Sequence, residues 1–406
     1  MPILPPTTEN IIRASEAIKS GDLVALPTET VYGLGANAFD GAACAKIFAL
    51  KGRPPTDPLI VHVHTRKDVY SVADVGTGRL HQAVDALINA FWPGPLTLVL
   101  PASKDVPEVV TAGRGTVGVR MPRHPVASSL IAETGTPIAA PSANRFGSIS
   151  PTTAESVALE FEGSDLLILD GGCCSIGLES TIVQLSPMSG TILRYGRISS
   201  EEISAVLTTS GLIGYTLTAL KVSASPAAKD TEVTCPGQFL RHYSPDRPTY
   251  LLCRVIPDLP GATQVLTSEF NETAVTVVDC NTDNVEFTQQ EYLELLRGAG
   301  FRENIFVDFL QAYKTVDEEE VFWSYGDGSK IEKKTSSKGT TEVSTYTSQN
   351  VAQGLYQTLR TADATSGMIV VIPPKMGFEA SAVRGLDAAI LDRCFRAASG
   401  KIILLP

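Results

Sequence analysis

The stretch PTETVYGLGANAFDGAACAKIFALKGRPPTDPLIVHV, Pro27 to Val63, is the part of the chain around which the rest is organised. The apolar run Leu23 to Leu26 precedes it and is typical of a buried strand that ends at a proline. Asp40 is placed to cap a helix, which should end at Gly52 because two prolines follow closely. The apolar run 59–63 predicts a second strand. We therefore expect a crossover of strand, glycine-bearing turn, helix and strand, with polar groups at strand ends where α/β proteins bind ligands.

Strands and helices alternate along the remainder of the chain. Up to about residue 207, this alternation predicts an α/β domain with a twisted, mixed sheet. A second series, from residue 249 to residue 405, predicts a smaller, Rossmann-like α/β domain. We expect residues 1–210 to form the first domain, 211–246 a linker and 247–406 the second domain. The Ser/Thr/Lys-rich segment 329–349 reads as a mobile insertion in the second domain.

Composition narrows the class of protein. The 406 residues are 43% hydrophobic and 19% charged, as in ordinary soluble globular proteins. No apolar run of about 18 residues occurs, so we expect no membrane contact. Seven cysteines without a CxxC pair predict neither a zinc site nor a disulfide framework, and a cytoplasmic location fits best. A net charge of −11 argues against broad capture of nucleic acid, so any RNA contact should be weak and local.

Polar side chains gather at the expected ends of strands and helices. Each group alone is explained about as well by an ordinary helix cap or surface ion pair as by a binding site. Together they place four cations beside apolar strands in an acidic protein, and such cations need anionic partners. An anionic small molecule with a polyphosphate fits this pattern, although the absence of GxxxxGK[ST] excludes a P-loop. The groups are Thr28/Thr30, Lys51/Arg53 with His62, Thr116/Arg120, Ser142/Asn144 with Ser150, and Ser180/Thr181 with Arg194.

Runs of identities extend this pattern to a known family. PTETVYGLGANA, followed by KGRPPTDPLIVHV, resembles the YrdC domain of threonylcarbamoyl-AMP synthases. Further segments match that family in order: RMP at Arg120, AAPSAN at 139–144, SISPT at 148–152, ESTIV at 179–183 and LRYG at 193–196. CPGQFLRHYSP from Cys235 and GLDAAILDR at 385–393 resemble its long, two-domain branch.

The resemblance implies an activity and a set of site residues. Enzymes of this family combine L-threonine, bicarbonate and ATP into threonylcarbamoyl-AMP and release pyrophosphate. The product serves modification of the adenosine beside the tRNA anticodon, so a tRNA-modifying transferase complex is the implied downstream partner. Mg²⁺ would accompany the ATP phosphates, without dedicated protein ligands.

Each implied contact can be placed on this chain. L-Threonine is assigned to Thr30, His62, Arg120, Ala140 and Ser180. ATP is assigned to Lys51, Arg53, Asp57, Thr116, Ser142, Ser150, Arg194 and Tyr243. Lys51, Arg53 and Arg120 are the candidate catalytic residues. Asp57 departs from the family pattern, because an acidic side chain facing a nucleotide is less natural than a neutral amide.

Segment 237–245, with Phe239, His242 and Tyr243, is expected to fold over the cleft as a lid.

Two alternative functions stay open at this point. One is a carbamoyltransferase that carries a YrdC-like domain and uses carbamoyl phosphate with ATP. The other is a non-catalytic RNA-binding protein, against which the acidic charge and the lack of aromatic-basic interleaving count.

Overall fold

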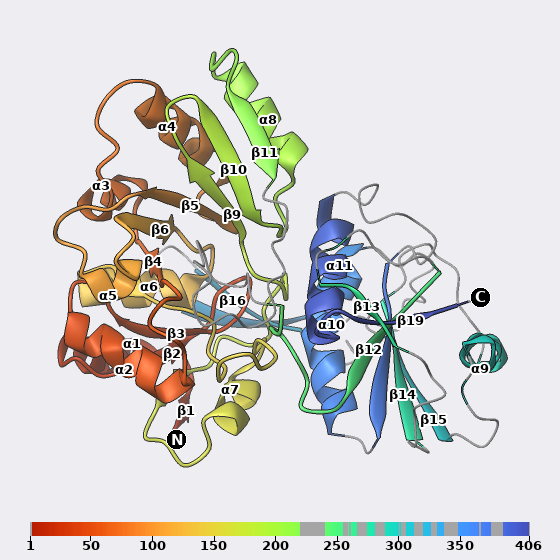
Figure 1. Ribbon diagram of the computed structural model, residues 1–406. Helices are drawn as coiled ribbons and strands as arrows, with labels where there is room; N and C mark the ends of the chain where they lie inside the picture. Colours follow the sequence, from red (N-terminus) through yellow and green to blue (C-terminus); the bar gives the residue numbers. More distant parts are fainter. Residues whose placement is uncertain are drawn as a thin grey trace.

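The computed structural model describes residues 2–219, 240–254, 259, 261–265, 274–280, 289–299, 301, 306–311, 320–325, 331–336, 348–364, 367–374 and 385–405. They form two α/β units, which lie side by side in Figure 1. The N-terminal unit comprises residues 2–219, and the C-terminal unit comprises the described residues from 247 onward, apart from 320–325 and 331–336, which form a separate two-stranded sheet. Helices α10 and α11 cover the face of the C-terminal sheet that is turned toward the N-terminal unit (Figure 1).

An eleven-stranded sheet forms the centre of the N-terminal unit, in the order β1-β8-β2-β3-β7-β4-β6-β5-β9-β10-β11. It contains both parallel pairs, such as β4 with β6, and antiparallel pairs, such as β5 with β6. The predicted mixed sheet is therefore confirmed. The strands are β1 Ile3–Leu4, β2 Val24–Leu26, β3 Gly33–Asn37, β4 Ile60–His62, β5 Leu96–Pro101, β6 Thr116–Arg120, β7 Ile138–Ala139, β8 Leu167–Leu169, β9 Thr181–Leu185, β10 Ser189–Arg194 and β11 Thr216–Ala219.

One element of the opening stretch was wrongly predicted. Gly33 and Gly35 lie in strand β3 and not in a turn. Strand β2 pairs antiparallel with β3, and β7 lies between β3 and β4, so the crossover runs from β3 through α2 to β4. The glycines are needed for close packing: a Cβ on Gly35 would lie 2.8 Å from Leu26 Cδ2 and 2.9 Å from Ile138 Cγ2. Glycine is common both in turns and at strand positions where other residues pack closely, and the sequence alone does not distinguish the two settings. The prediction of a turn at the two glycines follows from this ambiguity.

Helix α2, Gly41–Lys51, follows the prediction closely. The Asp40 side chain accepts hydrogen bonds from the backbone N–H groups of Ala42 and Ala43, which is N-cap geometry. The helix ends at Gly52, whose φ of 64° lies in the left-handed region that favours glycine. The other helices of this unit are α1 Thr8–Lys19, the 3₁₀ turn η1 Arg66–Asp68, α3 Val69–Val72, α4 Arg79–Phe91, α5 Glu108–Thr111, α6 Pro125–Thr134, α7 Ala154–Glu160 and α8 Ser200–Thr209.

The C-terminal unit has a six-stranded sheet in the order β13-β19-β12-β18-β14-β15. All its described pairings are parallel, as expected for a Rossmann-like layer. Its strands are β12 Thr249–Cys253, β13 Thr263–Gln264, β14 Ala274–Asp279, β15 Phe306–Gln311, β18 Met368–Ile372 and β19 Lys401–Leu404. Its helices are α9 Gln289–Gly298, α10 Ser348–Asp363 and α11 Gly385–Ala397. A separate antiparallel pair joins β16 Glu320–Tyr325 to β17 Ile331–Ser336.

The domain boundaries stay a prediction. Strand β11, the last of the N-terminal sheet, lies within the segment 211–246 that we expected to be the linker, and most of that segment lies outside the described residues. Strand β17 lies in the segment predicted to be an insertion, the rest of which, before Ser348, is also outside the described residues. Among the described helices, none is long and apolar enough to span a bilayer. Six of the seven cysteines are described, and all six are free thiols.

Close packing of β3 predicts a cost for adding one methyl group. Gly35→Ala should destabilise the protein by about 1–3 kcal/mol, because Leu26 and Ile138 are fully buried and cannot move aside easily. Gly118→Ala is the matched control: it is also a strand glycine, but its added Cβ would meet Ile60 Cγ1 at 3.4 Å. Urea unfolding of the two variants measures the difference, and equal midpoints would contradict the packing argument.

Candidate functional site

A cavity opens at the carboxyl ends of β4 and β6, two interior strands of the N-terminal sheet. Strands β4 and β6 are parallel neighbours, so their carboxyl ends bring His62 and Arg120 side by side in register. Nine of the thirteen predicted site residues line the cavity: Thr30, Arg53, His62, Arg120, Ala140, Ser142, Ser180, Arg194 and Tyr243. Lys51, Asp57, Thr116 and Ser150 do not line it.

Arg120 is held rigidly at the cavity wall. Its Nη1 donates to Thr30 Oγ1 at 2.8 Å, its Nε donates to the Gly94 carbonyl at 3.3 Å, and its Nη2 lies 2.7 Å from Glu29 Oε1. Burial of Glu29 favours its neutral form, but the Arg120 guanidinium outweighs this and lowers the pKa of the carboxyl. The cavity therefore contains a buried ion pair. Sequence reasoning missed Glu29, although it stands between two residues of the polar turn, Thr28 and Thr30.

His62 lies beside this ion pair and is buried. Burial, reinforced by the nearby Arg120 cation, lowers the pKa of His62 to about 3. Its ring is therefore neutral at physiological pH, with one nitrogen able to accept and the other able to donate. Among the described hydrogen bonds, its Nδ1, a buried atom, has no partner.

Arg53 and Asp57 form a second buried pair. Arg53 Nη2 lies 3.0 Å from Asp57 Oδ2 and donates to the Pro58 carbonyl at 2.8 Å, while Nε donates to the Asp57 carbonyl at 3.1 Å. Asp57 is fully buried and does not reach the cavity wall. Burial raises the pKa of Asp57, and the Arg53 guanidinium opposes this effect. This placement explains the unexpected acid: it is a partner that orients Arg53 from behind.

Lys51, at the end of α2, also lies behind the cavity wall. Its ammonium donates to the Ser142 carbonyl at 2.6 Å and to the Asn144 carbonyl. Burial and the neighbouring Arg53 charge lower the pKa of Lys51 well below its usual range. Lys51 therefore holds the loop after β7, which presents Ser142 to the cavity. Thr116 lies at the amino end of β6, whereas the cavity is at the carboxyl end of that strand.

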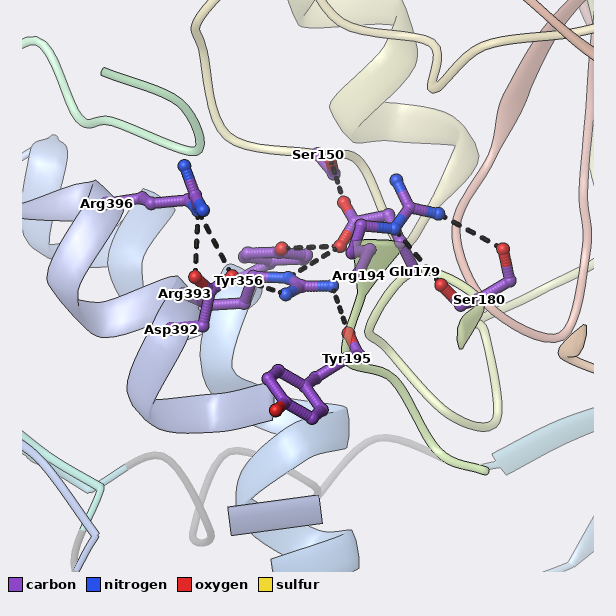
Figure 2. Close-up of polar contacts among 9 residues, drawn as sticks. All are labelled: Ser150, Glu179, Ser180, Arg194, Tyr195, Tyr356, Asp392, Arg393 and Arg396. Carbon is purple, nitrogen blue, oxygen red and sulfur yellow. Dashed lines mark hydrogen bonds and ion pairs between the residues drawn. The ribbon is translucent and has the colours of Figure 1, made fainter. Parts of the chain in front are cut away.

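Glu179 connects the two units at the cavity wall (Figure 2). Its Oε1 accepts from the Ser150 hydroxyl at 2.6 Å. Its Oε2 accepts from the Tyr356 hydroxyl at 2.9 Å and from Arg393 Nε at 3.0 Å, both from the C-terminal unit. Sequence reasoning did not assign Glu179, Tyr356 or Arg393 to the site. Glu179 and Arg393 stand in the matched segments ESTIV and GLDAAILDR, whereas nothing in the sequence singled out Tyr356.

Arg194, the last residue of β10, is oriented by Ser180. Its Nε donates to the Ser180 carbonyl and its Nη2 to the Ser180 hydroxyl, each at 3.1 Å (Figure 2). That hydroxyl lies a further 2.7 Å from the Thr97 hydroxyl. Arg194 and Ser180 thus reach the cavity as one hydrogen-bonded unit.

The end of the linker forms another part of the wall. His242 and Tyr243 are buried and line the cavity, with ring centroids 4.0 Å apart. The φ of Tyr243 is 59°, a left-handed conformation that is rare for a bulky residue and common at functional sites. The ring stacks on Tyr356 at 5.6 Å and lies 5.1 Å from the Arg393 guanidinium carbon. Phe239 lies outside the described residues, and the lid role of the segment stays a prediction.

The lowered pKa of His62 predicts a pH dependence of stability. Between about pH 6.5 and pH 3, the unfolded chain binds a proton at this histidine and the folded chain does not, so stability falls as pH falls. His62→Gln should remove this effect. Wild type should lose about 1 kcal/mol more than the variant between pH 6 and pH 5. Denaturant unfolding at each pH measures the difference, which should be constant above pH 7. Parallel stability curves down to pH 5 would contradict the assignment.

Two family models match this chain, and each covers one of the two units. A family model for Sua5, YciO and YrdC proteins, described as telomere recombination, matches residues 16–196. A second model, described as the threonylcarbamoyl-AMP synthase C-terminal domain, matches residues 198–399.

Curated relatives and a solved structure agree with both models. The threonylcarbamoyl-AMP synthase of Pyrococcus abyssi is 44% identical over 233 residues, which is 57% of this chain and 64% of that protein. The Bacillus subtilis enzyme of the same name is 41% identical over 249 residues, 61% of this chain and 68% of that protein. These alignments thus span about two thirds of each relative. The crystal structure of P. abyssi Sua5 complexed with L-threonine superposes with a TM-score of 0.70 at 31% identity, covering 98% of this chain and 96% of that one. The chain belongs to the threonylcarbamoyl-AMP synthase family, in the form that has both the YrdC-type and the C-terminal domain.

Proposed function

We propose that the protein makes L-threonylcarbamoyl-AMP from L-threonine, bicarbonate and ATP, with release of pyrophosphate. One observation carries the proposal: the cavity collects Arg53, Arg120 and Arg194, together with small hydroxyls, at the ends of buried strands. Family membership and the L-threonine in the related P. abyssi structure support the same reading. Three guanidinium groups suit a ligand that combines phosphates with a carboxylate.

The threonine site would comprise Thr30, His62, Arg120, Ala140 and Ser180, all of which line the cavity. A guanidinium has five N–H donors, and the described contacts of Arg120 occupy three of its nitrogens once each. Two N–H groups remain for the threonine carboxylate. The neutral imidazole of His62 offers a polar partner without adding charge.

The ATP site would be built in two layers. Arg53, Ser142, Arg194 and Tyr243 would contact the nucleotide directly, since they line the cavity. Lys51 and Asp57 would act from behind, because Lys51 holds the Ser142 loop and Asp57 holds Arg53. Ser150 would act through Glu179, to which its hydroxyl donates a hydrogen bond.

We propose that ATP is bound as its Mg²⁺ complex, in which phosphates and water, and not protein side chains, would hold the metal. The carboxylates of Glu29 and Glu179 are already paired with arginines. Among the described residues, no group of three or more His, Cys, Asp or Glu side chains is arranged to hold a metal ion. When bound, Mg²⁺ would neutralise charge on the phosphates that leave.

The reaction needs positioning more than proton transfer. The neutral amine of threonine combines with bicarbonate to give a carbamate and water. A carbamate oxygen then attacks the α-phosphorus of ATP, the new P–O bond forms, and the bond to pyrophosphate breaks. The arginines of the cavity can stabilise the charge that develops on the phosphates, and the cavity holds the reactants in line. Lys51 and Arg53, two of the candidate catalytic residues, therefore differ in role: Arg53 touches the phosphates and Lys51 positions the loop.

The linker would close the site during the reaction. An acyl-adenylate hydrolyses readily, so excluding water has a chemical reason. His242 and Tyr243 already cover part of the cavity, and Ser244 N–H donates to the Gly147 carbonyl at 2.9 Å. We propose that segment 237–245 acts as this lid.

The product would pass to a tRNA-modifying transferase complex in the cytoplasm, and no strong RNA contact of this chain is required. A carbamoyltransferase of the YrdC-containing type is the alternative. The match of residues 198–399 to the synthase C-terminal domain favours the synthase. A non-catalytic RNA-binding protein would have no need for a cavity with buried arginines.

The reaction itself is the first test. Purified protein with ATP and Mg²⁺ should release pyrophosphate only when both L-threonine and bicarbonate are present. Carbamoyl phosphate should not replace them. Pyrophosphate release that ignores threonine would contradict the proposal, and turnover with carbamoyl phosphate would favour the alternative.

Two arginine variants separate the substrate sites. Arg53→Ala should raise the KM for ATP, and Arg120→Ala should raise the KM for threonine. Each should do so by about 10-fold or more, because a charge-assisted hydrogen bond contributes about 1.5–3 kcal/mol. Arg13→Ala, an exposed position on α1, is the control and should change neither constant. Steady-state pyrophosphate release with one substrate varied at a time measures both. The site assignment would be wrong if the two variants shifted the same constant.

A further inference from the structure

The carboxylate of Glu179 is an unusual group to find in the wall of a cavity that is proposed to bind polyphosphate. It is ionised, because the Arg393 and Arg194 cations outweigh the effect of burial and lower its pKa. An uncompensated buried carboxylate would repel a phosphate nearby. Its two oxygens accept from three donors, Ser150, Tyr356 and Arg393 (Figure 2).

Arg393 makes the largest contribution to this arrangement. It is fully buried on α11 of the C-terminal unit. Its Nε donates to Glu179 at 3.0 Å and its Nη2 donates to the Tyr195 carbonyl at 2.9 Å, so one guanidinium bridges two segments of the N-terminal unit. A third contact, from Nη1 to Asp392 at 2.7 Å, fixes the guanidinium on its own helix.

The two segments held by Arg393 are both parts of the cavity wall. Glu179 precedes Ser180, and Tyr195 follows Arg194, so the bridge lies next to the hydrogen-bonded pair of Ser180 and Arg194. The Arg393 guanidinium also lies over the Tyr243 ring of the linker. Displacing it would therefore disturb the phosphate-facing wall and the covering ring together.

We propose that Arg393, assisted by Tyr356, is a positioning residue through which the C-terminal unit sets the affinity of the cavity for nucleotide phosphates. It does so by neutralising and orienting Glu179 and by fixing the backbone beside Arg194. This inference rests on the proposed function, because it takes ATP as the ligand. It gives the C-terminal unit a direct part in nucleotide binding.

A simple tether between the units would behave differently. Arg360, on α10, is also a largely buried arginine that crosses between the units: Nη1 lies 3.3 Å from Glu160 Oε2, and Nη2 donates to the Ile149 carbonyl. Its described contacts include neither Glu179 nor Tyr195, and it approaches the site only at the Ile149 carbonyl, one residue before Ser150. Arg360→Met is therefore the matched control for loss of an inter-unit arginine.

The experiment compares full-length Arg393→Met, Glu179→Gln, their double variant, Tyr356→Phe and Arg360→Met with wild type. Calorimetry measures the affinity for ATP and, separately, for threonine. Arg393→Met should weaken ATP binding by about 10-fold or more, since removing one partner of a buried pair leaves the other uncompensated. Its threonine affinity should fall by clearly less than its ATP affinity, because, of the proposed threonine residues, only Ser180 adjoins the Arg393 bridge, while Thr30 and Arg120 are held by each other and by Glu29. Tyr356→Phe, which keeps the ring and the charges, should have a smaller effect of the same kind.

Rescue is the decisive readout. Glu179→Gln removes the charge that Arg393 neutralises, so the double variant should bind ATP more tightly than Arg393→Met alone. Arg360→Met should retain ATP affinity within about 2-fold even where its thermal midpoint falls. If Arg393→Met does not fold, Arg393→Lys replaces it: lysine keeps the charge but cannot bridge both partners, and ATP affinity should fall selectively.

Three outcomes would overturn the inference: unchanged ATP affinity in the Arg393 variants, equal losses in Arg393→Met and Arg360→Met, or a double variant no better than Arg393→Met. Pyrophosphate release is measured on the same samples. A wild type that binds ATP but releases no pyrophosphate would contradict the proposed reaction and leave the binding comparison intact. A wild type that does not bind ATP would contradict both.

Discussion

Burial of charge is the constraint on which this structure depends. Arg120, Arg53 and Arg393 are each less than a tenth exposed, and each lies beside a buried carboxylate within 3.0 Å. Neither member of such a pair can be removed without leaving an uncompensated charge in a medium of low polarity. The pairs therefore fix the cavity before any ligand arrives. That preorganisation suits a reaction in which charge has to be stabilised rather than protons moved.

The same constraint links the two units. The N-terminal unit contributes Glu179, just before β9, but the cation that neutralises it comes from α11 of the C-terminal unit. Tyr356, from α10, adds a hydrogen bond to the same carboxylate and a stacked ring beneath Tyr243. Helices α10 and α11 thus face the cavity wall, as their position between the two sheets in Figure 1 indicates. Tyr243, in its left-handed conformation, is held there by its contacts with Tyr356 and Arg393.

Much of the fold followed from local patterns. Asp40 and Gly52 mark the ends of α2 because capping and left-handed termination are local properties. Strand β18 has a local pattern of the same kind, since it is a short apolar run in a parallel layer and is buried on both faces. Strand β3 was missed for the opposite reason. Glycine is needed at Gly35 because Leu26 and Ile138, on neighbouring strands, leave no room for a Cβ there. No local sequence pattern indicates such contacts.

The sequence by itself determined the α/β class, the family and the chemical character of the site, because capping, periodicity and the order of motifs are all written along the chain. Only the tertiary structure decided which polar residues face the cavity and which support them from behind. Lys51, Asp57 and Ser150 stand in matched segments, yet each turns its polar group toward another protein group and lies behind the wall. Glu29 and Arg393 have carboxylate or guanidinium partners 91 and 214 residues away in the chain, respectively. Pairings over such distances are set by how strands and helices pack, and no residue carries that information alone.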